Sequence, residues 1–447
     1  MAVEQTQKKT FHLDGNYAPV TAEVTAEELP VRGTLPPELS GLYLRNGPNP
    51  RDAASEHWFF GDGMLHGIDI SRGKARWYRN RWVRTRSFLE GAQVFSPTGD
   101  VDRTAGPANT HVIGHAGKIF ALVESSYPVE VTRELDTVGP CDFDGKLRTG
   151  MTAHPKTCPR TGELHFFGYG FMPPYLVYHV LDASGRLVKS EEITVGGPTM
   201  IHDFAITDRH VTFLDLPVCF DLEKAMQGTM PYRWSDDYPA RVGVMPRAGG
   251  DAEVRWFEVE PCYVFHPMNA YDDEHEGTCR VVVDTARYES LWRDTTNRFE
   301  PAKLHRWVFD LDAGTVRETP LDDRTIEFPR VDERRTGARH RYGYAVANPG
   351  GGINQPATEL VKYDLETGRS EAHEFGPGRV PSEGVFAPAS IGSGEDEGWV
   401  MTYVYDQREN ASDFVVLDAA RLSAPPVATV RLPQRVPYGF HGSWIPR

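Results

Sequence analysis

A hairpin pattern recurs along this chain and restricts its fold more than any other sequence feature. Three clear copies are YHVLDASG at 178–185, WVFDLDAG at 307–314 and VKYDLETG at 361–368, and an alternating polar segment follows each. A hydrophobic strand, an Asp/Gly turn and a returning strand are typical of a β-hairpin. Looser copies stand at 67–73, 132–139, 242–249 and 414–422, so that the chain contains seven copies.

The spacing of these hairpins predicts a β-propeller. Their turn glycines lie 46 to 66 residues apart, which suits one four-stranded blade per repeat. Short segments rich in β-branched and aromatic residues accompany the hairpins, at 119–124, 163–167, 210–214, 279–283, 341–345 and 398–404. Helical periodicity is confined to 222–226 and 26–29. We therefore expect an all-β, seven-bladed propeller that residues 1–447 form as a single domain.

Six polar residues fall at nearly the same phase of this repeat. Each lies 13 to 19 residues after the preceding hairpin turn, and they are His154, His202, His266, Glu327, Glu383 and His441. In a propeller, the outer hairpin of one blade leads into the innermost strand of the next blade, which lines the central channel. We therefore expect these residues to begin inner strands and to face one axis. His111, at the start of the remaining inner strand, is a further channel candidate.

Four histidines that face one axis predict a transition metal site. Buried imidazole nitrogens need partners, and several protonated rings would repel each other. Imidazole suits iron, copper, nickel or zinc, whereas a first shell without carboxylates disfavours calcium and magnesium. Metal-bound histidines usually donate their second N–H to a carboxylate or a carbonyl. Glu327 and Glu383 lie at the right phase to accept these hydrogen bonds and to offset the charge of the metal.

A structural role is the alternative for each histidine taken singly. The chain has sixteen histidines, and a lone histidine is more often a solvated or core residue than a ligand. His57 and His66 have the spacing of a metal pair, but the turn at 61–63 between them favours a structural role. The shared phase is what separates His154, His202, His266 and His441 from the rest.

Ten short motifs are spread almost from end to end of the chain. They are GLYLRNGPNP at 41–50, GDGM at 61–64, NTHV at 109–112, ALVE at 121–124, TAHP at 152–155, IHDF at 201–204, FHP at 265–267, IEFP at 326–329, SE at 382–383 and FHG at 440–442. Together they resemble the motifs of the carotenoid cleavage oxygenase family, which also includes stilbene-cleaving dioxygenases and the retinal-pigment-epithelium isomerase.

The resemblance implies a site as well as a fold. It implies a seven-bladed propeller with a cap of loops and short helices over an axial metal site. It implies Fe(II) held by His154, His202, His266 and His441, with three outer-shell glutamates at Glu124, Glu327 and Glu383. Glu124 lies outside the inner-strand phase, so its role comes from the resemblance alone. The chain departs from the family in having Gly384 after the third glutamate and Phe60 beside the 61–63 turn.

We therefore expect a non-haem Fe(II) oxygenase that cleaves a C=C double bond of an apolar conjugated substrate with O2 to give carbonyl products. Aromatic residues at 166–175, at 263–265 and at Phe386 favour an apolar tunnel, although each could equally be blade core. The stilbene-cleaving branch commonly has a lysine before the first outer-shell glutamate, and this chain has Val123. This difference favours an apocarotenoid or a carotenoid as the substrate over a stilbene or a phenylpropene.

Composition restricts the partners. A formal net charge of -15 argues against a nucleic acid, because phosphate contacts need a basic face. No apolar run approaches the about 20 residues of a membrane span, and five cysteines without a C-x-x-C pair favour a reducing cytoplasm. A weak peripheral membrane contact could use an apolar patch formed by Met226, Met230, Tyr232 and Trp234.

Two classes of protein compete with this interpretation. A propeller hydrolase or lactonase would bind calcium or a similar hard ion through carboxylates and amides. A binding scaffold of the WD type would carry Gly-His and Trp-Asp dipeptides in each blade, whereas this sequence has a single Gly-His, at 114–115, and no Trp-Asp. The sequence leaves open an isomerase or hydrolase on the same iron site, the bond that is cut, the number of oxygen atoms incorporated and the oligomeric state.

Overall fold

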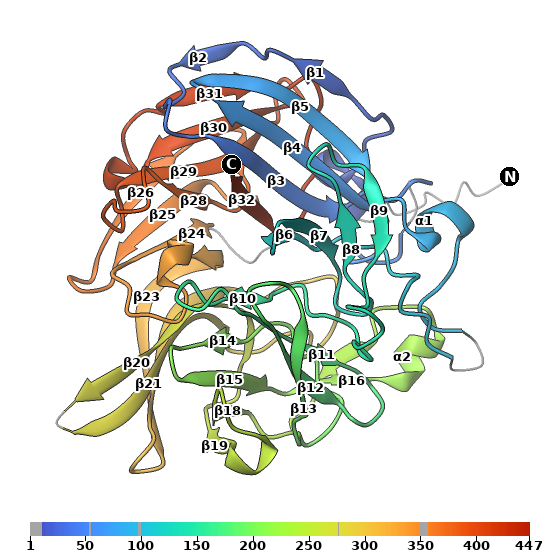
Figure 1. Cartoon of the computed structure of the whole chain (residues 1–447), viewed down its shortest axis with the longest axis vertical. Helices are drawn as coiled ribbons and strands as arrows, with labels where there is room; N and C mark the ends of the chain where they lie inside the picture. Colours follow the sequence, from blue (N-terminus) through green and yellow to red (C-terminus); the bar gives the residue numbers. More distant parts are fainter. Residues whose placement is uncertain (1–10, 53–54, 97–99, 276, 349–355) are drawn as a thin grey trace, which may run out of the picture.

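The computed structural model describes residues 11–52, 55–96, 100–275, 277–348 and 356–447. Nearly all of their regular structure is β-sheet, and the sheets are arranged around a central space (Figure 1). Two short α-helices are present in this part of the chain, α1 (Arg86–Glu90) and α2 (Leu222–Met226). Single 3-10 turns lie at Phe11–Leu13, Gly15–Tyr17, Asp251–Glu253, Glu333–Arg335 and Ala419–Arg421.

The two ends of the chain meet in one sheet. Its strands, in spatial order, are β1 (Thr25–Glu27), β5 (Lys74–Trp82), β4 (Gly63–Ser71), β3 (Gly41–Pro48) and β32 (Gly442–Pro446). The C-terminal strand β32 pairs with β3 from Gly41 opposite Pro446 to Arg45 opposite Gly442. Figure 1 shows this dark red strand beside the blue β3. This pairing joins the two ends of the chain in one blade and thereby closes the ring of blades.

Three further blades follow as four-stranded sheets in sequence order. The second contains β6 (His111–His115), β7 (Lys118–Leu122), β8 (Val129–Val131) and β9 (Thr137–Pro140). The third contains β10 (Lys156–Thr157), β11 (Leu164–Tyr169), β12 (Leu176–Leu181) and β13 (Leu187–Glu192). The fourth contains β14 (Ala205–Ile206), β15 (His210–Asp215), β18 (Arg241–Pro246) and β19 (Arg255–Glu258), with the separate hairpin of β16 (Val218–Phe220) and β17 (Tyr232–Trp234) inserted.

The fifth and sixth blades share a strand. Their common sheet contains β20 (Tyr263–His275), β21 (Thr278–Tyr288), β22 (Ala302–Asp310), β23 (Thr315–Arg330), β24 (Tyr342–Ala347), β25 (Glu359–Asp364) and β26 (Arg369–Glu374). The first part of β23 pairs with β22, and its last part, from Ile326, pairs with β24. This long strand is therefore the outer strand of one blade and the inner strand of the next.

The seventh blade completes the predicted count. It contains β27 (Arg379–Pro381), β28 (Val385–Pro388), β29 (Gly398–Asp406), β30 (Ala411–Asp418) and β31 (Ala428–Arg431), and the N-terminal β2 (Val31–Gly33) pairs with β31. The seven-bladed, all-β architecture is confirmed. One detail differs, because residues 26 and 27 of the helix expected at 26–29 belong to β1, which pairs with β5 and has Ala26 opposite Tyr78.

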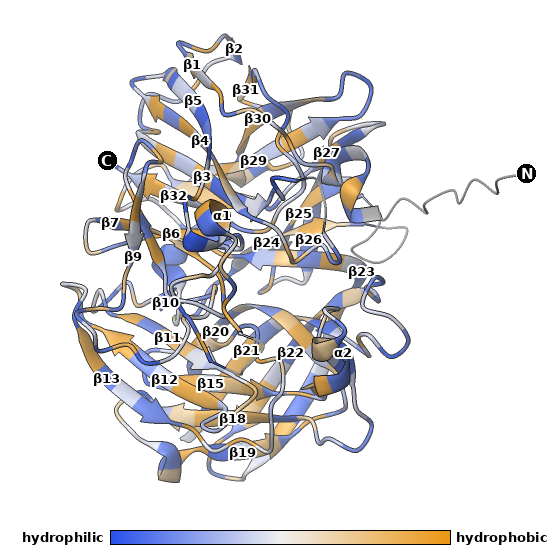
Figure 2. Ribbon diagram, turned by 90° about the vertical axis from the view of Figure 1, so that its right-hand side faces the viewer, coloured by the Kyte–Doolittle hydropathy of each residue, from blue (hydrophilic) through white to orange (hydrophobic). Residues whose placement is uncertain are grey.

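Burial follows the position of a strand within its blade. The middle strand β12 is buried at every residue, whereas the outer strand β13 alternates between half-buried and exposed residues. Middle strands are covered by neighbouring blades on both faces, so they tolerate apolar residues on both faces. Figure 2 shows the hydrophobic colour mainly on the strands and the hydrophilic colour mainly on loops and outer edges. Among the described residues, no helix has the length and apolar character needed to cross a bilayer.

Candidate metal centre

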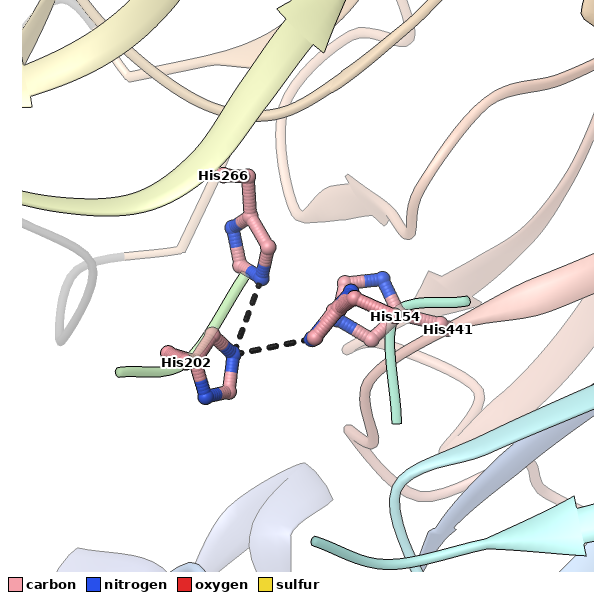
Figure 3. Close-up of side chains that lie close together, drawn as sticks. All are labelled: His154, His202, His266 and His441. Atoms are coloured by element: carbon pink, nitrogen blue, oxygen red, sulfur yellow. Dashed lines mark hydrogen bonds between the residues drawn. The ribbon is translucent and has the colours of Figure 1, made fainter. Parts of the chain in front are cut away.

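Four histidine side chains from four different blades meet in one place. His154 and His202 precede the inner strands β10 and β14, His266 lies within β20, and His441 directly precedes β32. One ring nitrogen of each lies within 4.8 Å of the corresponding nitrogens of the other three, and all four side chains are buried. Figure 3 shows the four rings turned towards one shared space. The four histidines thus converge on one point, as their shared repeat phase predicts.

The nitrogen positions fit a single metal ion. The Nε2 atoms of His154 and His202 are 2.9 Å apart, and those of His202 and His266 are 3.3 Å apart. Nitrogens bound at right angles to one ion, each about 2.1 Å from it, lie about 3 Å from each other. Four rings facing one space cannot all satisfy each other by hydrogen bonds, because a neutral imidazole has one donor and one acceptor. Imidazole ligands suit iron better than calcium or magnesium.

The environment favours neutral rings at two of these histidines. Burial, and then the neighbouring histidines, hold the pKa of His154 well below its usual value. Burial and the His266 ring do the same to the pKa of His441. Burial also opposes protonation of His202, but the adjacent Glu124 carboxylate outweighs it and raises that pKa. A neutral ring presents the lone pair that a metal ion requires.

Three of the four histidines face a glutamate through their second nitrogen. The pairs are His202 with Glu124, His266 with Glu327 (Nδ1 to Oε2, 2.6 Å) and His441 with Glu383 (Nδ1 to Oε1, 3.0 Å). A carboxylate that accepts from Nδ1–H sets the tautomer in which Nε2 carries the lone pair. The ring orientation is set at the same time, so that Nε2 faces the shared space.

A β-bulge in β23 places one of these glutamates. The pairing of β23 with β24 changes register between Glu327 and Arg330, and the intervening Phe328 has a left-handed backbone with φ of 51°. Such a conformation is uncommon outside glycine and recurs next to functional sites. The Phe328 ring stacks on His266 with centroids 5.4 Å apart and lies 5.2 Å from the His441 ring. The bulge thus presents Glu327 and an apolar side chain to the same site.

The fourth histidine has a carboxylate neighbour that the sequence reasoning missed. His154 Nδ1 lies 3.8 Å from Asp203 Oδ2, and Lys156 Nζ lies 2.8 Å from Asp203 Oδ1. Asp203 is almost fully buried. The signal was available, because Asp203 directly follows the predicted ligand His202, but the repeat phase singled out only one residue of each inner strand.

The other candidate histidines have structural partners. His111 lies beside the cluster, with its ring 5.2 Å from that of His441, but its Nδ1 bonds to the Ala153 carbonyl oxygen over 2.7 Å. His57 Nε2 bonds to a backbone oxygen 2.9 Å away, at Thr296. His66 Nδ1 bonds to the hydroxyl of a tyrosine 2.8 Å away. The structural interpretation of His57 and His66 fits these contacts.

A large cavity opens onto the histidine cluster. It has a volume of about 1650 Å³ and reaches His202, His266, His441 and Glu124. Its aromatic lining includes Phe59, Tyr169, Phe171, Phe265, Phe299, Phe328 and Phe440. The α1 and α2 helices and their loops contribute residues to its wall, as expected for a cap. Long apolar ligands bind in cavities of this kind.

Sequence reasoning placed only part of this lining correctly. Tyr169 to Pro174 and Phe265 line the cavity, but Phe166, Phe167 and Phe386 do not. Phe166 and Phe167 are fully buried blade core, and Phe386 packs on Tyr344. The reason is that successive side chains of β11 point to opposite faces and both faces are buried, so that Phe166 packs in one core cluster and Phe167 in another.

A second cavity of about 830 Å³ reaches the same cluster. It shares His266, Phe328 and His441 with the large cavity. Its remaining lining is more polar and includes His154, Lys156, Asp203, Arg330 and Glu383. The four histidines therefore lie between an aromatic cavity and a more polar one.

The apolar patch expected for membrane contact is only partly exposed. Met226 is 81% exposed, but Met230 and Trp234 are each 6% exposed and belong to the core. That part of the prediction is wrong, because β17 pairs with β16 and turns Trp234 inwards. Exposed apolar side chains that also line the cavity are Phe95, Val101, Met172, Leu222 and Met226.

Comparison with known proteins supports the same family. The model of the retinal pigment epithelial membrane protein family matches residues 17–446. The chain is 42% identical to a carotenoid cleavage oxygenase of Mycobacterium tuberculosis, with 99% of each chain covered. It is 36% identical to carotenoid 9,10(9',10')-cleavage dioxygenase 1 of Arabidopsis thaliana, over 97% of this chain and 89% of that one.

Solved structures show the same fold. A lignostilbene dioxygenase of Pseudomonas brassicacearum superposes with a TM-score of 0.90 at 31% identity, over 98% of this chain and 99% of that one. Cobalt-substituted apocarotenoid oxygenase of Synechocystis gives a TM-score of 0.85 at 28% identity, over 96% and 97% of the two chains. With its fold, its histidine cluster and these relatives, the chain belongs to the family of the retinal pigment epithelial membrane protein and the carotenoid cleavage oxygenases.

Proposed function

We propose that this chain is a ferrous-iron oxygenase that cleaves a C=C double bond of an apolar conjugated substrate of the apocarotenoid or carotenoid type. Both atoms of one O2 molecule enter the products, and each carbon of the broken double bond becomes a carbonyl carbon. The supporting observation is the cluster of four imidazoles that opens onto an aromatic-lined cavity. The family membership supports the same reaction class.

We assign the metal ligands to the four clustered histidines. Glu124, Glu327 and Glu383 would orient His202, His266 and His441, because each carboxylate faces the second nitrogen of its histidine. Iron bound there would supply the electrons that make O2 reactive towards an alkene, as non-haem iron does in oxygenases. The proposal requires of the protein a fixed set of neutral donors and a site that excludes competing ligands.

The cavity would hold the substrate by apolar contact. Phe265 lies with its ring 5.1 Å from the His202 ring, and Phe328 stacks on His266. These aromatic faces border the position where a conjugated chain would pass the metal. Because aromatic rings border the histidines, the shape of this aromatic wall would decide which double bond lies nearest the site.

The cavity wall next to the site supports a substrate of the apocarotenoid type. Val123 lines the cavity beside Glu124, at the position where a lysine would meet a phenolic hydroxyl. This favours an apocarotenoid over a hydroxystilbene. The stilbene alternative keeps some support, because the lignostilbene dioxygenase superposes with the higher TM-score of the two structures compared.

One experiment tests the reaction class. Metal-free protein is reconstituted with Fe(II) and given an apocarotenal or a hydroxystilbene under isotopically labelled O2. We expect aldehyde products only with both iron and O2, label in both products, and faster turnover of the apocarotenal. Products formed without iron or without O2 would exclude the oxygenase, and calcium-dependent hydrolysis would favour the propeller hydrolase class.

A weak peripheral membrane contact is a second part of the proposal. It is supported by the exposed rim of the cavity, where Met172 is 67% exposed and Leu222 is 63% exposed. Vesicle flotation of the protein and of Met226→Glu would test it, and equal flotation of both would argue against this surface. A cytoplasmic location stays a prediction, as does the single-domain organisation.

A further inference from the structure

The carboxylates around the four histidines differ in what else they bind. Glu124 Oε2 accepts from the Tyr169 hydroxyl over 3.0 Å, and Glu327 Oε1 accepts from the Tyr288 hydroxyl over 2.8 Å. Both donors are neutral. Glu383 instead accepts from a guanidinium, because Arg330 Nη1 lies 3.2 Å from its Oε1.

Arg330 is built into the structure around Glu383. Its side chain is 15% exposed, and Nη1 also donates to the Gly442 carbonyl oxygen over 3.3 Å. Nη2 donates to Glu333. The contact to Gly442 ties the arginine to the residue that follows the ligand candidate His441. A buried charge of this kind persists when it is paired, since an unpaired one is costly.

A second cation lies near the remaining histidine. Lys156 pairs with Asp203, whose other carboxylate oxygen is 3.8 Å from His154 Nδ1. Lys156 is 22% exposed and Asp203 is 2% exposed at the side chain. Both pairs line the smaller, polar cavity. Two of the four histidines thus face carboxylates with neutral partners, and two face carboxylates with cationic partners.

The charges of these groups nearly balance if the site holds a ferrous ion. Glu124, Glu327, Glu383 and Asp203 carry four negative charges. A ferrous ion, Arg330 and Lys156 would carry four positive charges, and Glu333, which also pairs with Arg330, adds one negative charge at the edge of the group. Without the two cations the carboxylates would exceed the metal charge by two, which would stabilise the more highly charged ferric ion.

We propose that Arg330 and Lys156 are positioning residues that hold the charge around the histidines near zero and thereby favour the ferrous state over the ferric state. The inference rests on the proposed iron site. It assigns a role to two side chains that act through their carboxylate partners, Glu383 and Asp203.

The test compares the ferric-to-ferrous ratio of the iron-loaded protein in a redox-buffered solution with that of Arg330→Gln, Lys156→Gln and the double variant. Iron content is measured first and matched. Loss of one positive charge beside a carboxylate of the cluster should shift the ferric-to-ferrous ratio towards ferric iron by about tenfold. The two shifts should add in the double variant. Arg330→Lys, which keeps the charge, should shift the ratio less than Arg330→Gln does.

Arg133→Gln is the matched control. Arg133 lines the same cavity but pairs with Asp69, at 3.5 Å, and with no carboxylate of the histidine cluster. Ratios within twofold of the parent protein for both single variants, or an equal shift in the control, would overturn the inference. If Arg330→Gln fails to fold, Lys156→Gln decides the question alone. Failure of the parent protein to bind iron would instead contradict the proposed function.

Discussion

The two halves of the histidine cluster are built differently. In one half, His202 and His266 face glutamates that accept from tyrosine hydroxyls. In the other half, His154 and His441 face carboxylates that bind a lysine or an arginine. We call His202, His266, their carboxylates and the tyrosines the tyrosine half, and His154, His441, their carboxylates and the cations the cation half.

The difference matches the surroundings of each half. His202, Glu124 and Tyr169 line the aromatic cavity, whereas the cation half contributes Lys156 and Arg330 to the polar cavity. A tyrosine satisfies a carboxylate without adding a formal charge, and its ring adds to an apolar wall. A cation is better placed where water can solvate part of it. A metal ion held by the four histidines would thus face an apolar ligand in the aromatic cavity. The cations on the side of the polar cavity would offset the charge of the carboxylates.

The largest expected effect comes from removing a ligand of either half. His266→Ala should abolish stoichiometric iron binding and reduce turnover by more than about 100-fold, because the effect of a ligand exceeds the 10- to 100-fold typical of outer partners. Metal analysis and the aldehyde assay check this. His57→Ala is the control, since His57 bonds to the Thr296 carbonyl oxygen away from the cluster, and it should keep its iron. Equal iron in both variants would contradict the assignment.

A substitution in each half should separate folding from metal binding. Glu383→Gln and Glu327→Gln should both weaken metal affinity by about 10- to 100-fold. Only Glu383→Gln removes a carboxylate from a buried cation, and because Arg330 keeps its contact to Glu333, it should also cost about 2 kcal/mol of unfolding free energy. Titration with Co(II) and chemical denaturation of the metal-free protein measure the two effects. A larger stability loss for Glu327→Gln would show that the halves are not distinguished by charge.

A cation introduced next to the tyrosine half should change which substrate is cleaved faster. Val123→Lys would place an ammonium group in the aromatic cavity beside Glu124. We expect kcat/KM for an apocarotenal to fall by about tenfold, because a polar group would replace an apolar contact, and kcat/KM for a hydroxystilbene to rise. Val123→Met is the size control and should change both values less. Unchanged selectivity in Val123→Lys would remove Val123 from the specificity argument.

The smallest effect concerns the two tyrosines. Tyr288→Phe should weaken metal affinity by a few-fold, in line with the about 1 kcal/mol of one hydrogen bond, because Tyr288 and Glu327 are both buried. Tyr169→Phe should have less effect, since the Glu124 side chain is 20% exposed and water can replace the hydroxyl. The same Co(II) titration resolves the order. A larger loss in Tyr169→Phe would reverse this ranking.

Much of the fold could be predicted because hairpin turns are local. Gly185, for example, has φ of 81° in the turn between β12 and β13. The Asp/Gly motif at 182–185 predicts a turn with glycine at this position. The expected helix at 26–29 was wrong because its local propensity is weak and pairing with β5 overrides it. The five residues of the α1 helix carried no periodic pattern that would have predicted it.

Of the candidate site, the repeat predicts only the residues that share its phase. The four histidines, Glu327 and Glu383 share one phase, so the architecture brings them together. Glu124 follows β7, the second strand of its blade, and only the resemblance to a family identified it. Arg330 and Lys156 meet their carboxylates across blade boundaries. Such contacts depend on a bulge and on side-chain conformation, which no spacing in the sequence encodes.

X-ray absorption at the iron edge of the Fe(II)-loaded protein is the most direct measurement of the central claim. If the four histidines hold one ferrous ion, the spectrum will show a first shell with about four nitrogen scatterers at about 2.1 Å and the multiple scattering of imidazole rings. A first shell made mainly of carboxylate oxygens, or an unchanged spectrum in His266→Ala, would contradict it.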